Sequence, residues 1–203
     1  MPFLLGLTGN IACGKTAVGR LLAERHGAEY IDADTLVHGL YAADTPETWA
    51  IAQRFGAHVR GPDGAIDRRR LSDLVLADPA ALQHLEAIVH PAVLRAVEQR
   101  VATSRAPVVV VDAIKLIESG LAARFQAVWV VTCDRADQLS RLQKIRGLTP
   151  EQAEQRIRVQ GSQEEKLRHA TAAIENRASL EELARQVEAA WGRTVAPHLN
   201  TQR

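Results

Sequence analysis

Cysteine is scarce in this chain of 203 residues, which contains only Cys13 and Cys133. Neither has a second Cys or a His near it in the sequence at the spacing of metal ligands, so a disulfide framework and a structural zinc site are not expected. The scarcity also favours the cytoplasm over an oxidising compartment. The chain also lacks an excess of charge of either sign, because 25 basic and 24 acidic side chains give a formal net charge of +1. The chain therefore has no overall electrostatic reason to bind nucleic acid or an anionic membrane surface.

Long hydrophobic runs and targeting segments are also absent from the sequence. No apolar run approaches the roughly 20 residues that a membrane-spanning helix needs, and no signal-peptide pattern stands at the N-terminus. There is no internal repeat and no low-complexity tract. We therefore expect a cytoplasmic protein without a membrane or nucleic-acid partner. A small-molecule substrate and a monomeric state are expected as well, although the sequence carries no signal for the oligomeric state. Its length fits one folding unit with inserted lobes.

Short apolar runs rich in Val and Ile alternate with long helical patterns, which is typical of a parallel sheet covered on both faces. We predict an α/β fold with three layers, α/β/α, around a five-stranded parallel sheet. The five strands are predicted at Phe3 to Leu7, Glu29 to Asp32, Val108 to Asp112, Ala127 to Thr132 and Ala173 to Glu175.

Several helix ends carry local signals. A capping side chain precedes a proline at the first helical position, or begins a capping box, at four places. These four residues are Thr45, Asp78, Thr149 and Ser179. The first helix is expected to end at Gly27, where glycine can adopt the left-handed conformation. The segment 195–203 is expected to fray.

About 75 residues without a clear buried strand separate the second and third strands, far more than a crossover helix needs. A second insertion, at about residues 138–169, is rich in charged residues and poor in apolar ones. We predict one domain over residues 1–203, with its core at 1–34, 106–137 and 170–195, an inserted helical substrate-binding subdomain at 35–105 and a lid at 138–169.

The strongest motif is Gly-Asn-Ile-Ala-Cys-Gly-Lys-Thr at Gly9 to Thr16, a complete G-x-x-x-x-G-K-[ST] phosphate loop. It follows a predicted strand and precedes a helical pattern, as the motif requires. Lys15 would reach the β- and γ-phosphates of ATP, and the Thr16 hydroxyl would bind Mg²⁺. The other loop residues predicted to hold the nucleotide are Asn10, Ile11, Ala12, Cys13 and Gly14. The alternative is a glycine-rich turn before a helix.

Carboxylates follow two of the predicted strands. Asp32-Ala33-Asp34 ends the second strand, where one carboxylate could accept the proton of an attacking hydroxyl. The alternative is a helix N-cap or a turn. Val108 to Asp112 resembles a Walker B strand, whose terminal Asp112 would orient Mg²⁺; the alternative is a buried strand that ends in a turn.

Basic residues of the predicted lid are candidates to contact the transferred phosphoryl group, because phosphoryl transfer gains from cations at that group. Arg141 and Arg146 are these candidates, and the alternative is a solvated helix face. Arg68 opens a run of three arginines that is equally well explained as a solvated face. His90 precedes Pro91, so it could contact a ligand or mark a helix boundary.

Cys13 lies inside the phosphate loop, beside Lys15 and a helix N-terminus. Both place positive potential near the sulfur, which favours the thiolate and a lowered pKa. The alternative is a small side chain packed under the loop and inert. Cys133, at the end of a buried strand, is expected to be far less reactive.

The combination of motifs resembles the dephospho-coenzyme A kinase family over about residues 4 to 191. The similar segments are Gly6 to Thr16, Ile31 to Asp34, Asp63 to Arg68, Leu85 to Pro91 and Ala170 to Asn176. The resemblance implies ATP-dependent phosphorylation of the ribose 3′-hydroxyl of dephospho-coenzyme A, the last step of coenzyme A synthesis. It implies that Asp34 is the base and that Asn176 contacts the nucleotide. Substrate contacts are expected from Thr8, Asp34, Arg68, His90 and Lys115.

Three positions depart from the family pattern. Lys115 follows Asp112 where the family has an apolar segment with a proline, and it could contact a phosphate or pair with Glu118. Ile145 stands where an arginine is common, one residue before Arg146. Thr171 replaces an aspartate before the last strand.

Two other classes of protein share the phosphate loop. Another small-molecule or nucleotide kinase would have the same loop and lid, but a compact acceptor such as shikimate or gluconate needs a smaller insertion than this one. A GTPase would carry an N-K-x-D sequence to read guanine, and the chain has none.

Overall fold

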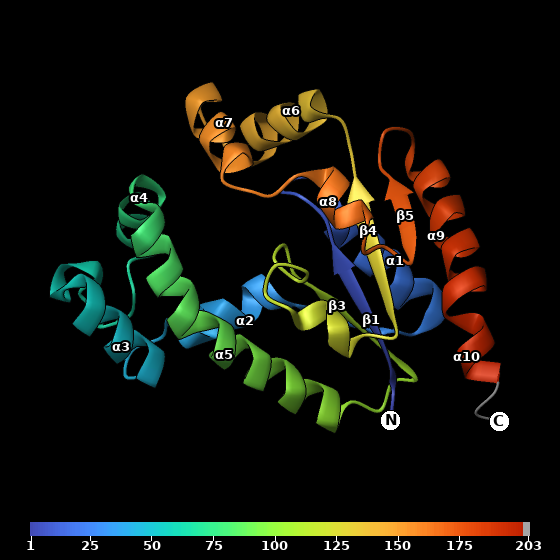
Figure 1. Cartoon of the computed structure of the whole chain (residues 1–203), viewed down its shortest axis with the longest axis horizontal. Helices are drawn as coiled ribbons and strands as arrows, with labels where there is room; N and C mark the ends of the chain where they lie inside the picture. Colours follow the sequence, from blue (N-terminus) through green and yellow to red (C-terminus); the bar gives the residue numbers. More distant parts are fainter. Residues whose placement is uncertain (201–203) are drawn as a thin grey trace. The chain divides into compact units, whose positions relative to one another are not determined.

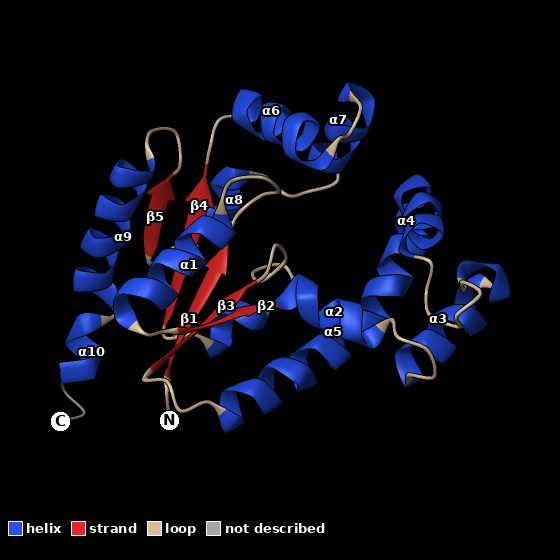
Figure 2. Cartoon of the chain, turned by 180° about the vertical axis from the view of Figure 1, so that it is seen from behind, coloured by secondary structure: helices blue, strands red, loops and turns tan. Residues whose placement is uncertain are grey.

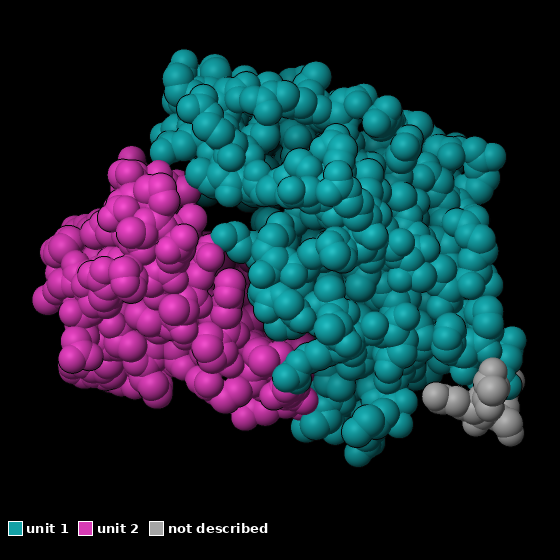
Figure 3. Space-filling model, in the orientation of Figure 1, with its two compact units in different colours: residues 1–32, 101–203 teal, residues 33–100 magenta. Residues whose placement is uncertain are grey.

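The computed structural model describes residues 1–200, and the chain forms two compact units (Figure 3). Unit 1 consists of residues 1–32 and 101–203, and unit 2 of residues 33–100. Residues 201–203, part of the segment expected to fray, lie outside the described residues. No described helix is long and apolar enough to cross a membrane.

Unit 1 contains a parallel sheet of five strands in the order β2-β3-β1-β4-β5. Figure 1 labels β1, β3, β4 and β5, and Figure 2 labels β2 as well. The strands are β1 (Phe3–Thr8), β2 (Glu29–Asp32), β3 (Val108–Asp112), β4 (Ala127–Thr132) and β5 (Ala172–Glu175). All five predicted strands and the α/β fold are confirmed. β1 is the central strand, so the loop that follows it lies at the carboxyl edge of the sheet, where open α/β sheets bind ligands.

One face of the sheet is covered by α1 (Lys15–His26) and α9 (Leu180–Thr194) (Figure 2). Alternate residues of a strand point to one face, and in β1 these are the fully buried Leu5 and Leu7. They belong to the same apolar core as Val18 of α1 and Val187 of α9. Burial of this face fixes the position of α1, and with it the phosphate loop that precedes the helix.

The opposite face of β1 is covered by the segment after β3, which includes the 3₁₀ helix η2 (Leu121–Arg124). A Cβ atom on Gly6 would lie 3.0 Å from Leu116 and 3.2 Å from Phe125. Glycine at this position lets the segment pack closely against the central strand. Helix α8 (Gln163–Leu167) also contacts β4.

The predicted caps are formed. Side chains accept hydrogen bonds from backbone amides of the first helical turn at Thr45, Asp78, Thr149 and Ser179. Gly27 ends α1 with φ 64°. The expectation that the chain frays from residue 195 is wrong for the described part, because Val195 is fully buried and α10 (Ala196–Asn200) follows it.

The segment predicted as a lid overlaps three helices, α6 (Arg135–Arg146), α7 (Pro150–Arg158) and α8. They have a small apolar core of their own, in which Leu142, Ala153 and Ile157 pack around Ile11 of the phosphate loop. The segment therefore holds more buried apolar surface than its charge density indicates.

Unit 2 is helical. Its elements are α2 (Ala33–Leu40), α3 (Pro46–Phe55), the 3₁₀ helix η1 (Ala57–Val59), α4 (Arg68–Ala77) and the first part of α5 (Pro79–Thr103). Its apolar core includes Ile51, Leu71 and Val89. Within the described residues of this unit the only β-type pairing is an antiparallel bridge between Arg60 and Ile66.

Pro91 lies inside α5, so the interpretation of His90-Pro91 as a helix boundary is wrong. A proline removes one backbone hydrogen bond and disfavours the helical conformation of the residue before it. The helix continues because Leu85, Val89 and Ala92 are all buried on both sides of the proline. Tertiary packing here outweighs the local preference.

Candidate active site

The phosphate loop joins β1 to α1 and depends on two glycines. Gly9 has φ 144°, and a Cβ atom there would lie 2.1 Å from the carbonyl oxygen of Val131. Gly14 has φ 96°, and its Cβ would lie 2.1 Å from the Asn176 side-chain amide. No described side chain caps α1 at Gly14. The N-terminus of α1 therefore keeps backbone amides and a positive dipole end for an anion such as a phosphate.

Two glutamines and an asparagine attach the loop to the helical segment 138–169. Gln160 accepts a hydrogen bond from the Ile11 amide at 2.7 Å, and Gln138 donates to the Ile11 carbonyl at 2.8 Å. Asn10 donates to the carbonyl of Gly161 at 3.1 Å. Each of these contacts joins residues more than 120 positions apart, so their spacing in the sequence does not show that they meet.

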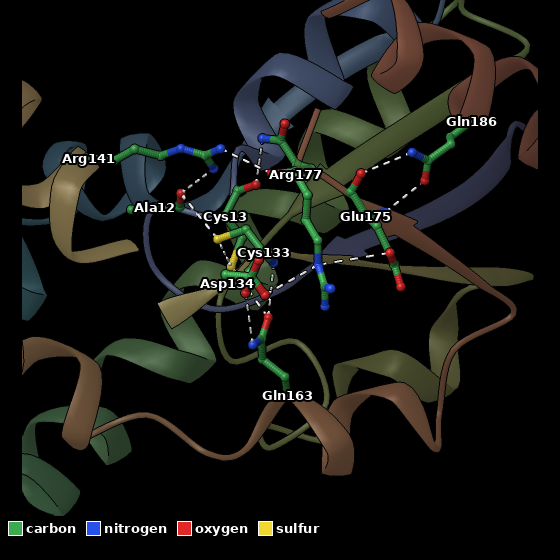
Figure 4. Close-up of polar contacts among 10 residues, drawn as sticks. Ala12, Cys13, Cys133, Asp134, Arg141, Gln163, Glu175, Arg177 and Gln186 are labelled. Carbon is green, nitrogen blue, oxygen red and sulfur yellow. Dashed lines mark hydrogen bonds and ion pairs between the residues drawn. The ribbon is translucent and has the colours of Figure 1, made fainter. Parts of the chain in front are cut away.

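Arg141 and Asn176 also contact the loop, and Figure 4 shows Arg141 pointing toward Ala12. The Arg141 guanidinium donates to the carbonyl oxygens of Ala12 and Asn176, both at 3.0 Å. The Asn176 side chain donates to the Cys13 carbonyl at 2.9 Å. The structure therefore brings Arg141 and Asn176 to the predicted nucleotide site. Arg146 is exposed in the last turn of α6, and no described contact joins it to the loop.

Lys15 and Asp112 lie side by side at the carboxyl edge of the sheet. The Lys15 ammonium is 4.0 Å from Asp112 Oδ1, and only 9 % of Lys15 is exposed. Asp112 Oδ2 accepts a hydrogen bond from the Tyr30 hydroxyl at 2.8 Å. Thr16 lies near the same phenol and slightly lowers its pKa. Both residues predicted to bind Mg²⁺ are thus close to one tyrosine.

Tyr30 was not singled out from the sequence. Burial raises its pKa well above the ordinary value, and the negative charge of Asp112 adds to this. The one available signal was Gly19, because a glycine inside a helix often marks a close approach by another group.

The chemistry of the donor set fits Mg²⁺. The Thr16 hydroxyl and the Asp112 carboxylate are hard oxygen donors, which Mg²⁺ prefers. The described residues contain no group of three or more His, Cys, Asp and Glu side chains that could hold a metal alone. Magnesium sites of this kind take their remaining ligands from water and the substrate's phosphates.

The two cysteines lie together although 120 residues separate them. Their sulfur atoms are 3.3 Å apart, both side chains are buried, and both thiols are free. The Cys133 thiol lowers the pKa of Cys13 by hydrogen bonding, and Lys15 contributes. The same bond and burial raise the pKa of Cys133. Cys13 is therefore packed under the loop, as the inert alternative requires, although its pKa is lowered as the reactive alternative requires.

Thr8 and Lys166 meet at one backbone carbonyl, in the turn that also carries Lys115. Thr8 is fully buried, and its hydroxyl donates to the Ile114 carbonyl at 3.1 Å, so the structure places this predicted substrate contact in the interior. Lys166 donates to the same carbonyl at 2.8 Å and lies 2.5 Å from Glu118. Lys115 is half-buried in the turn after β3.

The remaining predicted residues belong to unit 2. Asp34 is exposed in the first turn of α2, which begins directly after β2. A carboxylate there is stabilised by the helix dipole. Arg68 is exposed at the first position of α4, which Asp67 caps. His90 is half-buried in the middle of α5.

A phosphate loop alone is shared by several classes of nucleotide-binding protein. In this chain it lies at the end of the central strand of a five-stranded parallel sheet, and Arg141 reaches it from a separate helical segment. These features define a phosphate-loop kinase.

Comparison with known proteins identifies the kinase family. The dephospho-CoA kinase family model matches residues 3–182, and the chain belongs to this family. The sequence is 47 % identical to a dephospho-CoA kinase of Symbiobacterium thermophilum over 192 residues, which cover 93 % of this chain and 80 % of the relative. It is 44 % identical to that of Geobacter metallireducens over 191 residues, 93 % of this chain and 94 % of the relative.

A solved structure confirms the fold. The crystal structure of a Thermus thermophilus protein superposes with a TM-score of 0.80 at 34 % sequence identity, covering 94 % of this chain and 97 % of that one. The predicted family, fold class and kinase activity are therefore confirmed. Membership of a kinase family also implies ATP as the phosphoryl donor.

Proposed function

We propose that this chain transfers the γ-phosphoryl group of ATP to the ribose 3′-hydroxyl of dephospho-coenzyme A, which gives coenzyme A and ADP. The observation that carries this proposal is the match of the dephospho-CoA kinase family to residues 3–182, which includes the phosphate loop and the whole of unit 2. The hydroxyl oxygen forms a bond to the γ-phosphorus, and the bond from that phosphorus to the β,γ-bridging oxygen breaks. Asp34 takes the hydroxyl proton.

The phosphate loop stabilises the charge that moves during this step. Backbone amides of residues 14–16 and the Lys15 ammonium face the β- and γ-phosphates. When bound at Thr16 and Asp112, Mg²⁺ neutralises negative charge on these phosphates. Asn176 fixes the loop by holding the Cys13 carbonyl.

Arg141 is proposed to supply a further cation to the transferred group. Its guanidinium donates to two backbone carbonyls in this structure, and because it has five N–H groups it can also donate to a phosphate oxygen. The segment 138–169 is proposed to act as a lid that closes over ATP and excludes water. Hydrogen exchange in this segment should slow when ATP and dephospho-coenzyme A are both bound, and unchanged exchange would remove the lid assignment.

Substrate binding is assigned to unit 2 and to the turn after β3. Arg68 and His90 are proposed to contact dephospho-coenzyme A, and Lys115 to contact one of its phosphates. The fully buried Thr8 contributes through the Ile114 carbonyl instead of through substrate. The contact of Arg146 with the nucleotide stays a prediction. The cytoplasmic location and the monomeric state stay predictions as well.

The test is ATP consumption with dephospho-coenzyme A as acceptor, measured beside a panel of nucleosides, shikimate and gluconate. The product should gain one phosphoryl group by mass spectrometry. Lys15→Ala should reduce turnover by about 100-fold or more while the fold survives. Asp34→Asn should slow transfer and leave ATP affinity nearly unchanged, because the amide keeps the shape and cannot take the proton. Equal loss of ATP affinity would make Asp34 a structural residue, and preference for a compact acceptor would favour the rival kinase class.

A further inference from the structure

The phenol of Tyr30 lies beside the two side chains that are proposed to hold Mg²⁺. Its hydroxyl donates to Asp112 Oδ2 at 2.8 Å, and Thr16 is near enough to the phenol to affect its pKa. Thr16 is on the helix after the phosphate loop, and Asp112 ends the neighbouring strand β3. Tyr30 itself comes from β2, which pairs with β3, with Tyr30 opposite Val110.

The helix is shaped to receive this ring. A Cβ atom on Gly19 would lie 2.2 Å from Cε2 and 2.4 Å from Cδ2 of Tyr30. Gly19 is three residues after Thr16, so both are on the same face of α1. A glycine inside a helix costs about 1 kcal/mol relative to alanine. The space it leaves is filled by the tyrosine ring, which places the phenol at Thr16.

The phenol has one proton to donate, and the charge of Asp112 decides where this proton goes. Asp112 is a carboxylate, which accepts, so the single phenolic proton is donated to it. The phenol oxygen can then accept a hydroxyl hydrogen from Thr16, and in that arrangement the Thr16 lone pairs are left for Mg²⁺. On Asp112, Oδ2 is engaged by the phenol, while Oδ1 faces Lys15 at 4.0 Å.

We propose that Tyr30 is a positioning residue, which orients the Thr16 hydroxyl and the Asp112 carboxylate for the Mg²⁺ ion that accompanies the nucleotide. Groups that hydrogen-bond metal ligands fix the ligands' orientation, and their removal typically weakens metal binding by 10- to 100-fold. Because Mg²⁺ binding at this loop is part of the proposed function, the role of Tyr30 rests on that function. Gly19 is the residue that makes the arrangement possible.

Tyr30→Phe tests this role, because phenylalanine keeps the ring beside Gly19 and removes only the hydroxyl. The readout is ADP affinity by calorimetry, with excess Mg²⁺ and with the metal removed by EDTA. We expect ADP affinity in EDTA to change by less than about two-fold, and the gain in affinity from Mg²⁺ to fall by about ten-fold. Tyr41→Phe is the matched control, because it removes the only other phenol of the chain, from unit 2, and should leave both affinities unchanged.

The outcomes separate this role from the proposed function. If wild-type protein gains affinity from Mg²⁺ and Tyr30→Phe gains as much, the positioning role is overturned and the proposed function stands. If Tyr30→Phe loses ADP affinity equally with and without Mg²⁺, Tyr30 supports the loop as a whole and the role is again overturned. If wild-type protein binds no ADP under either condition, the nucleotide site itself is wrong and Tyr30's role falls with it.

Discussion

The Lys166 ammonium lies 2.5 Å from the Glu118 carboxylate, and only 2 % of Lys166 is exposed. The same ammonium donates to the Ile114 carbonyl. Lys166 therefore ties α8 to the turn that follows β3, the turn that also carries Lys115.

Lys166→Met should destabilise the protein by about 1–3 kcal/mol, because the Ile114 carbonyl loses one of its two donors and Glu118 loses a charged partner. Lys144→Met is the matched control at an exposed position of α6 and should change the free energy of unfolding by less than about 0.5 kcal/mol. Urea unfolding of both variants measures the difference. Equal stability of the two would show that the buried ammonium contributes nothing to the fold.

The two thiols should both resist chemical labelling in the folded protein. Cys13 and Cys133 are buried against each other, so a thiol reagent reaches them only when the loop opens. We expect labelling to be slower than in the urea-unfolded chain by about 100-fold or more, and slower still with Mg-ATP bound. Peptide mapping of the adducts gives the rate at each site. Rapid labelling of Cys13 in the native protein would mean that its lowered pKa, and not its burial, governs its reactivity.

Gly9→Ala and Gly39→Ala form a matched pair with opposite expected results. Alanine at position 9 would have to keep φ 144° with its Cβ 2.1 Å from a backbone oxygen, so we expect a loss of more than about 2 kcal/mol or failure to fold. Position 39 is inside α2 with no atom within 4 Å of the new Cβ, and alanine should add up to about 1 kcal/mol. Thermal unfolding measures both. Similar stability of the two variants would refute the close approach of β4 to the loop.

The strands and the loop were predictable because their signals are local. Each strand is a short apolar run, and the phosphate loop is one contiguous motif whose glycines and lysine have fixed positions. The structure places Arg141 and Asn176 at the loop, but they were proposed as nucleotide contacts only through the family resemblance and the expectation that lids carry arginines, and those contacts stay predictions. Pro91 was misread because burial on both sides of a proline is a property of the fold and not of the neighbouring sequence.

The contacts that complete the site could not be predicted. Tyr30 and Asp112 are 82 residues apart, and the cysteines 120 apart. Nothing in the spacing of such pairs shows that they meet, because the strand order of the sheet decides which strand ends are neighbours. The contact of Gln160 with the Ile11 amide is a similar case, because an amide that holds a backbone group has no required partner type in the sequence.

The chain's two tyrosines should both resist ionisation in the folded state. Burial raises the pKa of Tyr41 to about 12, although nearby Arg68 opposes the shift, and burial with the charge of Asp112 raises the pKa of Tyr30 further. A tyrosine in the unfolded chain ionises near pH 10. Above that pH the unfolded chain binds fewer protons than the folded one, so the free energy of unfolding must fall as the pH rises from about 10 to 12.

Tyrosinate absorbance measures this directly, because only Tyr30 and Tyr41 contribute. At about pH 11 the urea-unfolded chain should show most of the signal of two tyrosinates, and the folded protein less than about a fifth of it. Tyr30→Phe should retain the titration of Tyr41 near pH 12, whereas Tyr41→Phe should show no tyrosinate until the protein unfolds. If the folded protein already gives one full tyrosinate at pH 11, one of the two phenols is in contact with solvent. The Tyr41→Phe variant then shows whether that phenol is Tyr30, the one beside Thr16 and Asp112.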